Sequence, residues 1–134
     1  MAKIHRVAGR VFSRLLRERG IEINSAQGRV LFALWREDGI PITELARRTA
    51  LGKSALTSML DRLEAQGYVE RVPDAKDRRA TRIARTDKDR AMEVDYRRVS
   101  DEMSEIFYAG FSAAEIVRFE KDLERILANL EETE

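Results

Sequence analysis

Apolar residues recur along most of the chain at steps of three and four, the spacing that gathers side chains on one face of a helix. The pattern predicts six helices, over residues 3–19, 24–37, a short stretch after Pro41, 53–66, 86–109 and 112–130. Their predicted N-caps include Asn24, Thr43, Thr86 and Ser112. Asn24 with Gln27, and Ser112 with Glu115, have the three-residue spacing of a capping box. The chain is therefore expected to be mainly helical.

Between the fourth and fifth helices the period changes from helical to extended. Residues 68–72 and 80–85 are predicted strands, joined by the polar loop 73–79. The short helix before Thr49, a tight turn over 49–52 and the helix 53–66 form a helix-turn-helix. The expected fold is thus mainly α with a small β-hairpin wing. The predicted winged helix-turn-helix DNA-binding domain covers 21–86, and helices of a dimerisation region cover 1–20 and 87–134.

Charge is distributed unevenly along the sequence. The chain carries 25 Lys and Arg against 24 Asp and Glu, a net charge of +1. From Arg47 to Arg85, however, ten basic residues face five acidic ones. This separation gives the middle of the chain a positive field that a polyanion would feel, although a solvated surface explains the charges equally well.

The helix 53–66 is the predicted recognition helix. Its apolar residues Leu56, Met59, Leu60 and Leu63 are expected to face the core. The predicted DNA-contacting residues on its outer face are Lys53, Ser54, Thr57, Ser58 and Arg62. Hydroxyls and cations of this kind bond phosphates and base edges, whereas an ordinary surface helix would more often carry Glu/Lys pairs. The alternative is that the hydroxyl residues only cap the helix and fill its solvated face.

The hairpin loop is the second predicted contact with DNA. Its candidate residues are Lys76, Asp77, Arg78 and Arg79 in the loop and Arg82 on the returning strand. Guanidinium groups on a projecting tip can enter a narrow minor groove, where the potential is most negative. Asp74 and Asp77 are expected to orient these arginines through paired hydrogen bonds.

The run LTSMLDRLEAQGYVERVPDAKDRRATRIART resembles the most diagnostic stretch of the multiple-antibiotic-resistance regulator (MarR) family. In that family a recognition helix ending in LxxxGxVxR leads into a wing with an Asp-x-Arg element, which Asp77 and Arg79 match. The upstream ITELARRTALGKSALTSML resembles the family's helix-turn-helix, and the flanking helices agree in order and length. The resemblance implies a dimeric transcription regulator whose DNA release often follows ligand binding, with Arg79 in the minor groove.

Two residues depart from the family pattern. Where the family has Leu-Thr and then Gly three residues later, this chain has Arg85-Thr86 and Asp89. Arg85 shares a strand face with Ile83, so either its side chain reaches out to solvent or the base of the wing is packed unusually. Asp89 is expected to favour the helix dipole from the first helical turn.

The terminal helices carry more apolar surface than a small wing-and-helix core can cover, which predicts a homodimer. The candidate interface residues are Val7, Val11, Leu15, Ile106, Phe119, Leu123, Ile126 and Leu130. A small-molecule effector could occupy a pocket lined by Trp35, Tyr96, Phe107, Tyr108 and Phe111. Packing in the core or interface is the alternative role for these aromatic residues.

Other kinds of site have little support. The chain has no Cys and one His, His5, which is expected to be a surface residue, so no metal site or cofactor is expected. No catalytic constellation stands out, and the expected protein is not an enzyme. No membrane-length apolar run or secretory signal is recognised, which favours the cytoplasm. The alternative function is a winged-helix module that binds an acidic protein instead of DNA.

Overall fold

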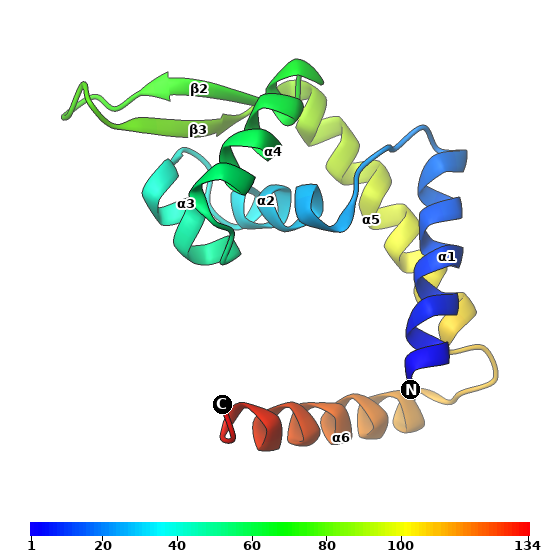
Figure 1. Cartoon of the computed structure of the whole chain (residues 1–134). Coiled ribbons are helices and arrows are strands. Elements are labelled where there is room, and N and C mark those ends of the chain that lie inside the picture. Colours follow the sequence, from blue (N-terminus) through cyan, green and yellow to red (C-terminus); the bar gives the residue numbers. More distant parts are fainter.

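The fold is described by a computed structural model that covers residues 1–134, apart from the side chain of Ser25. The helices are α1 (Ala2–Glu18), α2 (Ser25–Arg36), α3 (Ile42–Thr49), α4 (Lys53–Ala65), α5 (Asp87–Phe107) and α6 (Ala113–Glu131). The strands are β1 (Ile40–Pro41), β2 (Val69–Pro73) and β3 (Thr81–Arg85). The fold is therefore mainly helical with a small antiparallel wing, as the sequence predicts (Figure 1).

The sheet has a third strand that the sequence did not reveal. The strand order is β1-β3-β2, and both pairs are antiparallel. β1 pairs with β3 at only two positions, Ile40 with Ile83 and Pro41 with Arg82. Because Pro41 leaves this pairing directly into α3, it is also the N-cap of that helix. The prediction of Thr43 as the N-cap is wrong, since Thr43 lies inside the first turn.

The other predicted caps are confirmed. Asn24 accepts from the Gln27 N–H, and the Gln27 side chain accepts from the Asn24 N–H. Ser112 and Glu115 form the same reciprocal pair at the start of α6, and Thr86 accepts from the Asp89 N–H. Between α3 and α4, Ala50 adopts the left-handed conformation (φ 54°) that closes the helix-turn-helix turn.

The core gathers around the helix-turn-helix. Leu56, Leu60 and Leu63 of α4 are almost fully buried, as predicted, whereas Met59 is only partly buried. Leu31 and Leu34 of α2 belong to the same cluster. Because three leucines of one helix face are buried, the opposite face of α4 is the one left for a ligand.

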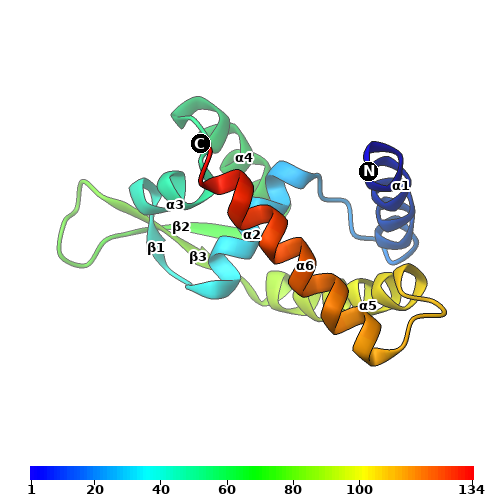
Figure 2. The same ribbon diagram turned by 90° about the horizontal axis from the view of Figure 1, so that it is seen from below.

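The two terminal helices differ in how they pack. α1 lies along α5, and its Leu15 and Leu16 are buried in the core. α6 has no buried residue, and it leaves the end of α5 and runs apart from the helix-turn-helix (Figures 1 and 2). In the part of the chain that the structure describes, no helix is long and apolar enough to cross a membrane.

Candidate nucleic-acid interface

The outer face of α4 presents free polar side chains. Lys53, Ser54, Thr57, Ser58 and Arg62 are all exposed. Within the described residues, only Thr57 among these five has a side-chain hydrogen bond, from its Oγ1 to the Lys53 carbonyl at 2.9 Å. A hydroxyl that donates to its own helix still has lone pairs with which to accept from a DNA base.

The two acidic residues of α4, Asp61 and Glu64, are both paired with an arginine of the wing. Asp61 accepts from Arg71 Nη2 of β2 at 2.7 Å, and Arg71 Nη1 also donates to Glu64 at 2.8 Å. The hydrogen bond to Asp61 is the largest contribution that raises the pKa of Arg71. Since Asp61 is already paired, Lys53 and Arg62 determine the sign of the charge that α4 offers to a polyanion.

The two aspartates of the wing fold its tip. Asp74 Oδ1 accepts from the N–H groups of Lys76 (2.7 Å) and Asp77 (3.3 Å), and Asp77 Oδ1 accepts from the Arg79 N–H (3.0 Å). The Lys76 N–H is the main cause that lowers the pKa of Asp74, and Arg82 adds to the effect. Both carboxylates thus bind backbone of the loop. Asp74 also pairs with the Arg82 guanidinium, as predicted, whereas Asp77 does not orient a guanidinium.

The cations at the tip remain available. Lys76, Arg78 and Arg79 are exposed, and no side-chain partner occurs for them among the residues described. The wing carries them away from the helices (Figure 1). The carboxylates of this compact turn bind loop backbone and Arg82, so the turn projects three cations that have no ion pair among the described residues.

Arg82 has a different environment from these three. Its Nε donates to Asp74 Oδ2 and its Nη1 to the Gly39 carbonyl, both at 2.8 Å. The sequence predicts Arg82 as a DNA contact, but two of its donors already tie the wing to the loop before β1. Its position supports a role in holding the wing rather than in binding DNA directly.

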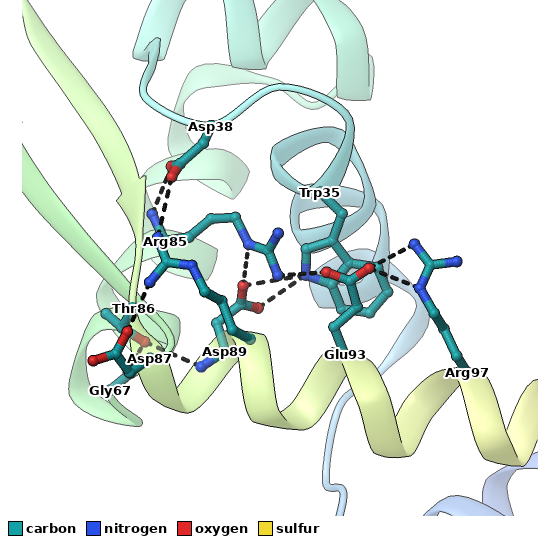
Figure 3. A network of polar contacts seen from close by, with 10 residues as sticks. Trp35, Asp38, Gly67, Arg85, Thr86, Asp87, Asp89, Glu93 and Arg97 are labelled. Carbon is teal, nitrogen blue, oxygen red and sulfur yellow. Dashed lines mark hydrogen bonds and ion pairs between the residues drawn. The ribbon is translucent and has the colours of Figure 1, made fainter.

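The sequence left open whether the Arg85 side chain reaches solvent or packs at the base of the wing. This side chain is 12% exposed and pairs with Asp89 and Glu93 of α5. The wing base is therefore packed unusually, and Arg85 does not extend into solvent. The two departures from the family pattern, Arg85 and Asp89, contact each other (Figure 3).

The predicted aromatic group divides into two. Phe32, Trp35 and Tyr96 pack edge to face and line a cavity of about 330 Å³, together with Arg36, Arg97 and Ser100. Phe107, Tyr108 and Phe111 instead cluster at the end of α5, where Tyr108 also contacts Phe119 of α6. A single pocket lined by all five predicted aromatic residues is therefore wrong, because the two groups belong to different parts of the fold.

The candidate interface residues are exposed to different degrees. Val7, Ile106, Phe119, Leu123, Ile126 and Leu130 are all exposed. Val7 and Ile106 line an apolar groove between α1 and α5. Val11 packs against the core, and Leu15 is only 6% exposed. The prediction that Leu15 serves an interface is corrected here, because its surface is already covered by its own chain.

Comparisons with known proteins agree with this geometry. A family model described as MarR family matches residues 23–81. A MarR transcriptional regulator from Methanosarcina mazei Go1 is 27% identical, with a TM-score of 0.79 over 99% of this chain and 94% of that chain. Apo wild-type MarR from E. coli is also 27% identical, with a TM-score of 0.76 over 94% and 92%. A cysteine-to-serine mutant of E. coli MarR complexed with operator DNA is 28% identical, with a TM-score of 0.71 over 94% and 92%. No curated protein sequence matches the chain.

Proposed function

Because the chain belongs to the MarR family of winged helix-turn-helix transcription regulators, we propose that it is a homodimeric repressor released from its operator by a small-molecule effector. DNA binding for transcription control, and not enzymatic catalysis, is the activity of this family. The observation that carries the proposal is the set of exposed cations on α4 and the wing tip, which have no ion pair among the described residues. A dimer would set two recognition helices into successive major grooves, which predicts half-sites about 10 base pairs apart.

Selection of bound sequences from random DNA by the purified protein tests this function. A pseudo-palindromic consensus is expected. If the outer face of α4 and the wing tip instead bind an acidic protein, no consensus sequence emerges. Random DNA then binds without the steep salt dependence of phosphate contacts.

Arg79→Ala is expected to weaken operator binding by about 1–3 kcal/mol, the range for a good groove contact, and to leave folding unchanged. The reason is that Arg79 is exposed at the wing tip, where its backbone N–H donates to Asp77 and its side chain has no partner among the described residues. Titration at fixed salt measures the loss. Arg125→Ala on α6, where the side chain is 82% exposed, is the matched control. Equal affinities of the two variants contradict the placement of Arg79 in DNA.

Contacts that position α4 and contacts that recognise bases should respond differently to salt. Arg62, in the last turn of α4, is expected to bind phosphate, whereas Ser54 and Thr57 in the first turns approach base edges. Arg62→Ala should weaken cognate and random DNA alike and reduce the salt slope by about one. Ser54→Ala and Thr57→Ala should lower only the preference for the cognate site. An Arg62 variant that changes specificity alone would mean that α4 is rotated differently in the groove.

The effector is proposed to bind in the cavity between α2 and α5. Three aromatic rings form its walls, and Arg36 is exposed beside them with no ion pair among the described residues. This combination suits a flat anion. Trp35 is the only tryptophan of the chain, so its fluorescence reports on the cavity. Benzoate is expected to quench it, and Arg36→Ala to weaken that binding about tenfold, the loss of one charge-assisted hydrogen bond. A titration without quenching contradicts this site.

A further inference from the structure

The end of the wing is joined to the helices by a network of polar contacts (Figure 3). Arg85, the last residue of β3, donates through Nε to Asp89 at 2.5 Å and through Nη2 to Glu93 at 2.6 Å. Asp89 is fully buried and also accepts from Trp35 Nε1 of α2 at 3.0 Å. The Arg85 guanidinium lies 5.9 Å from the centre of the Trp35 ring. One strand end is thus fixed to two helices at once.

Glu93, one of the two acidic partners, is held in its charged form by two arginines. Burial would raise the pKa of Glu93, but hydrogen bonds from Arg97 and Arg85 outweigh it and lower that pKa below its ordinary value. Asp89 has no exposed surface, so without Arg85 a carboxylate would remain buried with only the Trp35 Nε1–H to compensate it among the described residues. Such a loss costs far more than the loss of an exposed ion pair.

Other contacts hold the sides of the wing: Arg71 of β2 bonds to two carboxylates of α4, and Arg82 of β3 bonds to the Gly39 carbonyl. Among the described residues, Arg85 is the residue of β3 whose side chain bonds to α5. β1 pairs with β3 only at Ile83 and Arg82, and the strand toward the tip pairs with β2 alone.

Arg79 is six residues from Arg85 and two residues beyond the tip end of β3, so it lies at most about 20 Å from Arg85. A rotation of about 10° at Arg85 would therefore move Arg79 by up to about 3–4 Å. A shift of this size breaks a hydrogen bond, because donor–acceptor distances vary by only about 0.5 Å.

We propose that Arg85 is a positioning residue for DNA binding. Through Asp89 and Glu93 it fixes the angle at which the β2–β3 wing leaves the helices, and so places Arg79 in the minor groove. The inference rests on the proposed function of the wing. It also explains why Arg85 and Asp89 occur together where the MarR family has apolar and small residues.

A double-mutant cycle with Arg79→Ala tests this role. The background Arg85→Leu with Asp89→Asn removes both charges, and asparagine keeps an acceptor for Trp35, so this background is expected to fold. In the wild-type background, Arg79→Ala should lower operator affinity about 5- to 150-fold. In the Leu/Asn background the same substitution should lower it less than about threefold, since the wing no longer has one orientation.

The control background is Arg98→Leu with Asp95→Asn, an ion pair on α5 that has no contact with the wing. There the effect of Arg79→Ala should equal that in wild type. Arg85→Lys keeps a cation beside Asp89 but replaces the two separate nitrogens that bridge Asp89 and Glu93 with a single ammonium, and it should give an intermediate factor. This variant also provides the cycle if the Leu/Asn background does not fold.

The outcomes are distinguishable. An Arg79→Ala effect that is equally large in all backgrounds overturns the positioning role and leaves the proposed function intact, because Arg85 then only stabilises the fold. An Arg79→Ala effect that is absent in wild type overturns the wing contact itself, and the positioning role with it. Folded fractions measured by circular dichroism separate either result from lost stability.

Discussion

Replacing Phe119 and Leu123 together with aspartate is expected to convert the protein to a monomer and to lower operator affinity about 100-fold or more. α6 has no buried residue in the single chain. Phe119 and Leu123 belong to one apolar stripe of this helix, and their exposed fractions are 37% and 39%. A second copy that covers this stripe would bury the new carboxylates without partners. Loss of the dimer also removes the link between two half-site contacts, which is the source of the large affinity change. Sedimentation measures the oligomeric state.

Ala114→Asp with Ala128→Asp is the matched control, since it adds the same two charges to the same helix. At 100° per residue Ala128 lies opposite Phe119, and Ala114 lies well away from the stripe. This control should remain dimeric and bind the operator normally. A Phe119/Leu123 variant that stays dimeric with unchanged stability would place the interface elsewhere.

The periodic parts of the fold could be predicted from the sequence because their signals are local. Helical spacing is repeated several times within each helix, and the Asn24 and Ser112 capping boxes lie within four residues. β1 could not be predicted in this way. It has only two residues, one a proline, and its partner strand comes more than 40 residues later. The sequence predicts Thr43 as the cap because the local pattern does not show that Pro41 pairs with β3. That pairing makes Pro41 the N-cap and places the start of α3 at Ile42.

The candidate site also has a part that local sequence signals predict and a part that they do not. The exposed face of α4 follows from which of its residues are apolar, so its polar side could be predicted. The roles of Arg82 and Arg85 could not, because each depends on partners brought together by the fold, such as the Gly39 carbonyl and Trp35. One signal was present for Arg85: Asp89 and Glu93 follow it at steps of four, the spacing of helical ion pairs. Because Arg85 is predicted in a strand, this helical spacing does not by itself indicate an ion pair.

Leu60→Ala is expected to destabilise the protein by about 2–5 kcal/mol. Leu60 is 1% exposed on the inner face of α4, in the cluster that packs this helix against α2 and β2. Truncation removes apolar contact and leaves a cavity that rigid neighbours cannot fill. Urea unfolding at fixed protomer concentration measures the loss, because the proposed dimerisation would add to the apparent stability.

Met59→Ala is the control for the Leu60 prediction, since Met59 is adjacent on the same helix but only partly buried. It should cost clearly less, because part of its side chain is already in water. Leu60 does not reach the outer face of α4, so the folded fraction of the Leu60 variant should bind the operator with nearly unchanged affinity. Equal losses of stability in the two variants would contradict the burial of Leu60. A loss of affinity in the folded fraction would instead show that packing beneath α4 sets the position of its DNA-binding face.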